Sequence, residues 1–209
     1  MGGDVNPTAI VFAKGDAVVL NETMTVKTRV KDGDSWSAIN ETTFLVDLAP
    51  ATAESFVVSE IMYDPSAATE AEIAAGYSKG DFEYIEIYNA SDTAIDLTNL
   101  SINDGVRFDF NSGELLSLAP QSYAVIVSNL EAFKMRYGTS ASIAGEFGKS
   151  LNNDGETLEI TDDRLATIKK VTYGDRDPWP DTADGDGFSL ELVSPADNPN
   201  PNDPASWTA

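Results

Sequence analysis

The sequence of 209 residues contains no cysteine and no histidine. It therefore cannot form a disulfide, a zinc site built on thiolate or imidazole ligands, or a catalytic arrangement of the Ser-His-Asp or Cys-His type. Two kinds of site chemistry remain for such a chain. These are paired carboxylates, as in glycoside hydrolysis, and cations bound by oxygen ligands, such as calcium or magnesium.

Basic residues are also scarce, since 13 Lys and Arg stand against 35 Asp and Glu and the net charge is −22. A surface of this sign repels phosphate backbones and anionic membranes, so we expect no nucleic-acid partner. Long hydrophobic runs are absent as well. The stretch from Tyr123 to Val127 is among the longest and is too short to cross a bilayer, so we expect no direct membrane insertion.

A hydrophobic content of 42% nevertheless indicates a folded protein. Short alternating or β-branched segments recur along the chain, separated by Gly, Asn, Asp and Pro, which is typical of an all-β sandwich or barrel. The expected strands are residues 17–20, 23–30, 36–46, 56–63, 82–88, 94–97, 106–110, 122–127, 157–161, 168–173 and 188–193.

Two segments depart from the β pattern. Residues 69–76 contain good helix formers between a potential N-cap, Thr69, and a potential stop, Gly76, in a surface excursion. Residues 128–138 predict a second short helix, in which Ser128 and Glu131 form a capping box.

Composition also suggests the domain boundaries. Residues 1–48 form a truncated β segment that contains a hairpin, and residues 56–209 form the main domain. The stretch LAPATAES between them is small, polar and interrupted by Pro50, so residues 49–55 are predicted to be a linker.

Several motifs of residues 56–209, in this order, resemble the lamin-tail domain, an immunoglobulin-like β-sandwich of nuclear lamins and of bacterial extracellular proteins. They are VVSEIMYDP, DFEYIEIYNASDTAIDLTNLSI, LLSLAPQSYAVIVSN, FGKSLNNDGETLEI, VTYGDRDPWP, ADGDGFSLEL and NPNPNDPASW. An insertion at residues 67–79 departs from the family pattern. The resemblance implies an all-β, immunoglobulin-like sandwich with one or two short helices and a small N-terminal hairpin.

The segment LNETMTVKTRVKDGDSWSAINETTFLV resembles the last strands of the immunoglobulin-like module appended to chitobiases and related bacterial surface enzymes. That resemblance covers about residues 8–48 and lacks the earlier strands of the module. Together the two resemblances imply a fragment of a longer bacterial protein that is secreted or located at the cell surface.

The acidic stretch DRDPWPDTADGD suggests a metal site. Calcium binds carboxylate and carbonyl oxygens on flexible loops, so Asp181, Asp184 and Asp186 are candidate calcium ligands, and no other cofactor is predicted. The stretch lacks the bidentate glutamate of an EF-hand loop. The alternative is that these residues make a tight structural turn, as the family resemblance implies.

If the protein were a glycosidase, its paired carboxylates would come from Glu60, Glu83 and Glu86. Glu83 and Glu86 are an odd number of positions apart on a predicted strand, so they point to opposite faces and cannot act on one substrate. The alternative role of Glu86 is structural, as a cap for backbone amides or a partner of Arg107.

Among the aromatic residues, Trp179 and Tyr173 are candidates for stacking against a sugar ligand. Trp179 lies between Pro178 and Pro180, and the alternative is that it plugs one end of the sandwich, while Trp207 fixes the C-terminal tail to the body of the domain.

These observations predict a non-enzymatic module of a larger secreted or cell-surface bacterial protein, which acts in protein interaction or envelope attachment. Its expected partners are neighbouring domains of the parent chain and a protein or glycan not identified by the sequence. The alternative is a carbohydrate-binding accessory module of a surface hydrolase, dependent on calcium or not. A carboxylate-based hydrolase is a third and weaker reading.

Overall fold

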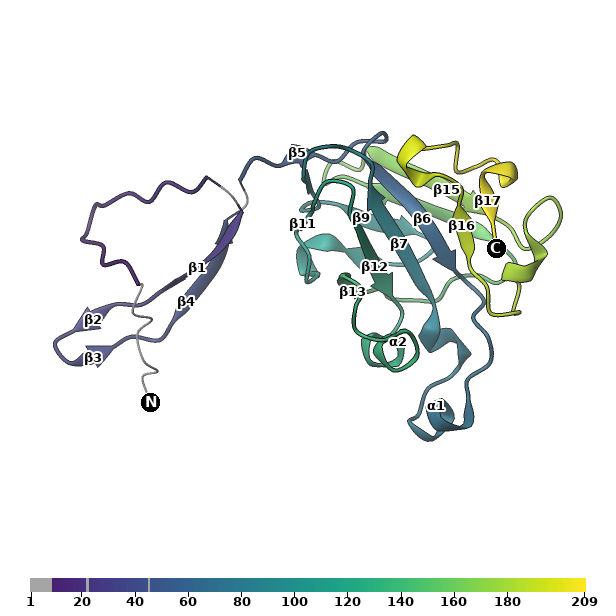
Figure 1. The fold of residues 1–209 in the computed structure, drawn as a ribbon, viewed down its shortest axis with the longest axis horizontal. Coiled ribbons are helices and arrows are strands. Elements are labelled where there is room, and N and C mark those ends of the chain that lie inside the picture. Colours follow the sequence, from purple (N-terminus) through teal and green to yellow (C-terminus); the bar gives the residue numbers. More distant parts are fainter. Residues whose placement is uncertain (1–8, 22, 45) are drawn as a thin grey trace. The chain divides into compact units, whose positions relative to one another are not determined.

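The computed structural model describes residues 9–21, 23–44 and 46–209. The chain divides into two compact units, Met1–Leu48 and Ala49–Ala209 (Figure 1). In the described residues, none of the helices is long and apolar enough to cross a membrane.

The first unit is a long β-hairpin. Strand β1 (Met24–Thr28) pairs antiparallel with β4 (Asn40–Phe44), and between them β2 (Lys31–Asp32) pairs with β3 (Ser35–Trp36) around a turn at Gly33. The predicted N-terminal hairpin is therefore present. The segment 17–20, which was expected to form a strand, is irregular in the structure. Residues 1–8, 22 and 45, which belong to the predicted segment 1–48, lie outside the described residues.

The second unit is built on a six-stranded sheet in the order β13-β12-β7-β6-β16-β17. All neighbours in it are antiparallel except β12 and β13. The bounds of these strands are β6 Phe56–Met62, β7 Tyr84–Asn89, β12 Tyr123–Val127, β13 Ile143–Glu146, β16 Leu190–Leu192 and β17 Trp207–Thr208.

Two smaller sheets complete this unit. A four-stranded sheet has the order β10-β9-β14-β15, and a three-stranded sheet has the order β11-β8-β5. Their bounds are β5 Ala49–Pro50, β8 Ile95–Asp96, β9 Ser101–Asp104, β10 Phe108–Asp109, β11 Ser117–Leu118, β14 Glu156–Thr161 and β15 Thr167–Tyr173. Short 3-10 turns lie at Lys79–Phe82, Phe110–Ser112, Asp181–Ala183, Pro195–Asp197 and Pro204–Ser206.

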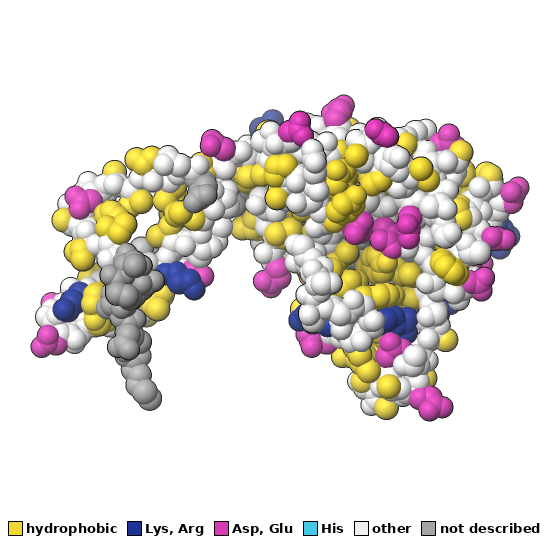
Figure 2. Space-filling view, in the orientation of Figure 1, with side chains coloured by type: hydrophobic (Ala, Val, Ile, Leu, Met, Phe, Trp, Pro, Cys, Tyr) yellow, Lys and Arg dark blue, Asp and Glu magenta, His cyan; other side chains and the backbone are white. Residues whose placement is uncertain are grey.

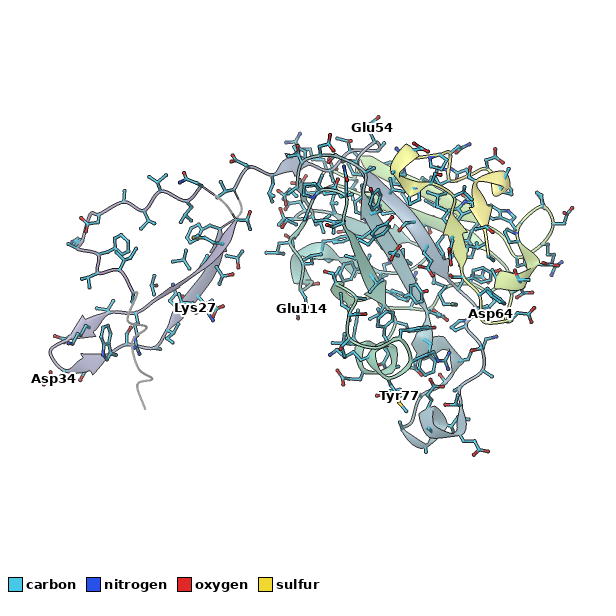
Figure 3. The ribbon with its side chains drawn as sticks, in the orientation of Figure 1. Lys27, Asp34, Glu54, Asp64, Tyr77 and Glu114 are labelled. Atoms are coloured by element: carbon cyan, nitrogen blue, oxygen red, sulfur yellow. The ribbon has the colours of Figure 1, made fainter. Side chains whose placement is uncertain are left out.

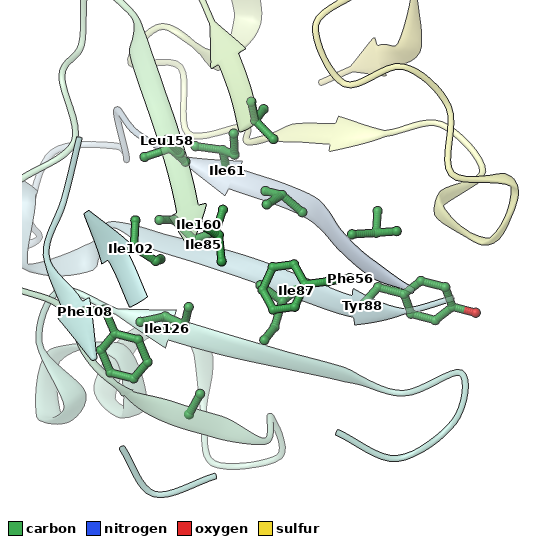
Figure 4. Packing of buried hydrophobic residues seen from close by; sticks show 14 of the residues in the cluster. Phe56, Ile61, Ile85, Ile87, Tyr88, Ile102, Phe108, Ile126, Leu158 and Ile160 are labelled. Carbon is green, nitrogen blue, oxygen red and sulfur yellow. The ribbon is translucent and has the colours of Figure 1, made fainter. Parts of the chain in front are cut away.

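The hydrophobic core lies between the six-stranded and four-stranded sheets (Figure 4). Alternate residues of β6 and β7, including Ile61, Ile85 and Ile87, meet Ile102 from β9 and Leu158 from β14. Each of these five side chains is at most 1% exposed. The expected all-β sandwich is thus confirmed, because a period of two along each strand places the apolar side chains in one shared layer.

The segment predicted as a linker, residues 49–55, belongs to the second unit instead. Ala49 and Pro50 form β5, which pairs parallel with β8, and the Ala51 side chain is buried in the core. Small side chains suit a tightly packed edge as well as a linker, so composition alone did not separate the two cases.

Two short helices flank the sheet, as predicted. Helix α1 (Glu70–Ala74) has Thr69 as its N-cap in a capping box with Glu72. Helix α2 (Leu130–Tyr137) starts one residue later than the predicted capping box requires. Its N-cap is Asn129, whose side chain accepts the amides of Glu131 and Ala132, so the prediction of Ser128 as the cap was wrong.

The insertion that carries α1 is fastened to α2 by one arginine. Arg136 Nε lies 2.8 Å from Glu72 Oε1, and its terminal nitrogen lies 2.6 Å from Glu72 Oε2. The guanidinium also donates to the Ser66 carbonyl and lies 3.3 Å from the centroid of the Phe82 ring. The hydrogen bonds from Arg136 hold the pKa of Glu72 down at about 2. The insertion is therefore an anchored element.

The C-terminal tail is held to the body by side-chain hydrogen bonds. The Trp207 indole N–H donates to the Pro201 carbonyl at 2.9 Å, and its ring is 5% exposed within the core. At the edge of β15, the Asn202 side chain accepts the Thr172 amide and donates to the Lys170 carbonyl, at 2.8 and 3.2 Å. Asn202 thus continues the backbone ladder in a tail whose prolines have no amide hydrogens.

We expect Trp207→Ala to destabilise the second unit by about 3–5 kcal/mol, since it removes a buried indole and frees the tail. Urea denaturation followed by far-UV circular dichroism measures this difference. Trp36→Ala in the first unit is the matched control, because that ring is 37% exposed. Equal effects of the two substitutions would show that the tail is not part of the cooperative core.

Candidate functional site

The acidic stretch from Asp175 to Asp186 lies beyond the end of β15, at the end of the sandwich where β6 also ends. Asp181 begins a 3-10 turn and Asp184 closes it, and its amide donates to the Asp181 carbonyl at 3.1 Å. Over the residues that the structure describes, no group of three or more acidic side chains is arranged to hold a metal ion. The turn interpretation fits this geometry, and calcium binding by Asp181, Asp184 and Asp186 stays a prediction.

The two aromatic candidates for sugar stacking are packed into the domain. Tyr173 is 2% exposed, its ring stacks on Tyr63 at 5.0 Å, and its hydroxyl donates to the Asn152 carbonyl at 2.9 Å. Its faces are therefore closed to a ligand, and its proposed stacking role is corrected. Trp179 is partly buried against the core and lies so close to Gly174 that a Cβ there would come within 2.8 Å of the ring. Trp179 thus has the position of a plug at this end of the sandwich.

The residues just after the C-terminal end of β6 form a polar cluster that the sequence did not indicate. Asp64 is 5% exposed, pairs with Lys79, and accepts the Asn153 side-chain amide at 2.6 Å (Figure 3). Next to it, the Tyr63 hydroxyl is buried and has no partner among the described residues. Burial, followed by the negative charges of Asp184 and Asp175, raises the pKa of Tyr63. Both causes favour the neutral form of the phenol.

Glu83 lies at the same end of the sandwich. Its carboxylate is 4% exposed and accepts the Leu151 amide at 2.8 Å, so it fastens the loop before β14 to the start of β7. Burial raises its pKa to about 7, and the nearby carboxylates of Glu156 and Asp64 add to that effect. A raised pKa is a property of general acids, but this carboxylate is bonded to a backbone amide, which is a structural role.

Glu60 and Glu86 lie side by side on the outer face of the six-stranded sheet. Glu60 accepts the hydroxyls of Tyr84 and Ser189, whereas Glu86 accepts the Ser59 hydroxyl at 2.8 Å. The partner of Glu86 is therefore Ser59, and the alternative of Arg107 was wrong. Glu83 is bonded to a separate loop, as expected from the opposite faces of the strand.

Glu191 extends this pair into a row across three strands. It is directly opposite Glu60 in the β16–β6 pair, and Glu60 is opposite Glu86 in the β6–β7 pair. Burial and then the charges of Glu60 and Glu191 raise the pKa of Glu86. Figure 2 shows acidic side chains grouped over this part of the molecule, beside a hydrophobic surface. Like charges in cross-strand register destabilise a sheet, so this acidic row, Glu86, Glu60 and Glu191, has a cost in the isolated domain.

A groove of about 540 Å³ lies on another part of the domain, beside α2. Phe108, Leu130 and Ile143 form apolar parts of its lining, and Glu114 and Glu146 are also at its wall. Glu146 is already occupied, since it accepts the Leu130 amide at 2.7 Å and so helps to cap α2. Ser112, Lys134 and Thr139 supply the other polar side chains of the lining.

The comparison with known families agrees with this architecture. The model of the lamin tail domain matches residues 49–175, more than half of the chain. This chain belongs to the lamin tail domain family. The match starts at Ala49, where the second unit also starts. No curated protein and no solved structure matches the chain.

The match to the lamin tail domain does not include residues 1–48, so the resemblance of about residues 8–48 to the chitobiase-type module stays a prediction. Within the lamin tail domain, the sequence indicates Glu60, Glu83 and Glu86 as the carboxylates of a disfavoured glycosidase and does not single out Glu191. The alternation of FSLELV places Glu191 on the outer face. Only the pairing of β16 with β6 shows that it lies next to Glu60.

For this lamin tail domain we expect Glu83 to make stability depend on pH near neutrality. Its pKa is about 7 when folded against an ordinary value of 4.5, so its contribution is complete below pH 4.5 and is lost as the pH rises through 7. The loss is on the order of 3 kcal/mol, at 1.36 kcal/mol per pKa unit. Urea denaturation at a series of pH values measures it.

In Glu83→Gln the amide oxygen still accepts the Leu151 amide and does not titrate, so this fall in stability should disappear. The control is Glu131→Gln, whose carboxylate is 70% exposed on α2 and should leave the pH profile unchanged. A Glu83→Gln profile that parallels that of the unsubstituted protein would contradict the assignment.

Proposed function

We propose that this chain is a non-enzymatic protein-binding module of a larger secreted or cell-surface bacterial protein. The acidic row on the outer face of the six-stranded sheet carries the proposal. Its partner is a protein surface rich in arginine or lysine. This binding serves attachment to the cell envelope or contact with neighbouring domains of the parent chain. A nucleic-acid partner is disfavoured by the net charge of −22.

The use of the carboxylates within the fold supports a role without catalysis. Glu83 binds a backbone amide, Glu60 binds two hydroxyls and Glu86 binds one. Each of these carboxylates is thus an acceptor within the fold. Glycoside hydrolysis would instead need two carboxylates that face each other across a gap large enough for a substrate. The chain also lacks the histidine and cysteine of the common nucleophilic arrangements.

The row itself supports a cationic partner. Three carboxylates in adjacent strands repel one another, and the charges of Glu60 and Glu191 add to the larger effect of burial in raising the pKa of Glu86. A guanidinium or ammonium group placed over the row would relieve that repulsion and gain hydrogen bonds. Tyr123 packs against Tyr88 of the neighbouring strand, with ring centroids 4.4 Å apart, and is 45% exposed, so it offers an aromatic surface for a cation.

The proposed binding is tested with an arginine-rich synthetic peptide by isothermal titration calorimetry. The variant Glu86→Gln/Glu191→Gln should weaken binding more than about tenfold, or about 1.4 kcal/mol. The matched control Glu70→Gln/Glu131→Gln removes the same charge from α1 and α2 and should change affinity less than about twofold. Equal losses in both variants would show that only the overall charge attracts the peptide.

Absence of catalysis is tested separately, on panels of glycans, phosphoesters and peptides. We expect no turnover above that of a buffer control. A robust turnover that disappears in Glu83→Gln or Asp184→Asn would overturn the proposed function. In the alternative of a carbohydrate-binding module, Tyr173 is too deeply buried to stack on a sugar. Binding to a glycan array that is abolished by Trp179→Ala would favour that alternative.

A further inference from the structure

The β1–β4 hairpin of the first unit has one apolar and one polar face. The register pairs Met24 with Phe44 and Val26 with Thr42, so these side chains share a face. On the opposite face, Thr25 and Thr43 share a hydrogen bond at 2.9 Å, and Lys27 forms an ion pair with Glu41 at 3.0 Å (Figure 3). The hairpin is thus patterned to cover something with one side and to meet water with the other.

The apolar face is uncovered within the first unit. Met24 is 38% exposed and Phe44 is 46% exposed, and Val26 is only partly buried. The neighbouring segments add further exposed side chains, which are Ile10, Val11, Phe12, Val18, Val19, Val30, Trp36 and Ile39. A two-stranded hairpin is marginally stable by itself in water, and a monomer rarely exposes so much apolar surface. Another β layer is needed over this face.

The net charges of the two units favour a second hairpin as this covering layer. Residues 24–44 carry three basic and three acidic residues, so the hairpin is electrically neutral. Residues 49–209 carry nine basic against 28 acidic residues, a net charge of −19. Two copies of this chain repel each other through their second units, whereas two hairpins meet without net repulsion. A neutral, amphipathic hairpin is complementary to itself, as a two-fold symmetric interface requires.

We propose that the apolar face of the β1–β4 hairpin binds the same face of a second copy of this chain. The two hairpins stack as a four-stranded, two-layer sandwich, with Met24, Val26 and Phe44 of each copy in the shared core. This association is independent of the acidic row, so either can fail alone.

The first test is sedimentation velocity of the full 209-residue chain up to about 1 mM, the dissociation constant of a contact worth about −4 kcal/mol. We expect a dimer of twice the 22.4 kDa monomer mass. It should become tighter between about 0.01 M and about 1 M salt, because the Debye length falls from about 30 Å to about 3 Å and screens the acidic units. A chain that stays monomeric throughout overturns the proposal.

Two substitutions locate the interface. Val26→Asp puts a charge on the apolar face and should weaken dimerisation more than about tenfold. Thr25→Asp puts the same charge on the polar face of the same strand and should change it less than about twofold. Equal effects overturn the assignment of the face.

A cross-link keeps the test decisive even where Val26→Asp unfolds the hairpin. The chain has no cysteine, so Val26→Cys introduces a single thiol. A bismaleimide of about 10 Å, the spacing of stacked sheets, should join two copies of Val26→Cys. It should join Thr25→Cys poorly, since that thiol faces water, and cross-linking of both variants to the same extent overturns the proposal.

Discussion

The inner faces of the six-stranded and four-stranded sheets cover each other, and the rest of the lamin tail domain depends on that burial. Ile85 and Ile87 of β7 are each 1% exposed, and Leu158 of β14 is fully buried. Because side chains alternate along a strand, the same contact forces Tyr84 and Glu86 to the outer face of the sheet. The core therefore decides which residues the domain presents to its surroundings.

The outer face of the six-stranded sheet has two parts that differ in what covers them. Over one part, Phe133 of α2 packs on Tyr84 and Val125, and the Arg136–Glu72 pair fastens the insertion beside it. Over the other part, the acidic row of Glu86, Glu60 and Glu191 crosses three strands, and no helix of the described residues covers it. In Glu86, the hydrogen bond from the Ser59 hydroxyl opposes part of the rise in pKa that burial causes.

The two units contrast in what they can bury. Residues 49–209 close a core around more than thirty buried apolar side chains and concentrate the negative charge of the chain outside it. The first unit has an amphipathic hairpin with a neutral charge balance and no second layer of its own among the described residues. One unit thus presents charge and the other presents apolar surface, so electrostatics and the hydrophobic effect act on separate parts of the chain.

Sequence alone determined the fold class, because strands such as β6, β7, β12, β14 and β15 repeat with a period of two that the core enforces. It missed β13, where Gly145 lacks a side chain to show the pattern, and it chose Ser128 over Asn129 as the cap of α2. Tertiary structure decided the rest. The burial of Tyr173, the unpartnered hydroxyl of Tyr63 and the place of Glu191 beside Glu60 all depend on strands paired across long stretches of chain. Such pairing follows from the packing of the whole domain, and the local sequence pattern does not predict it.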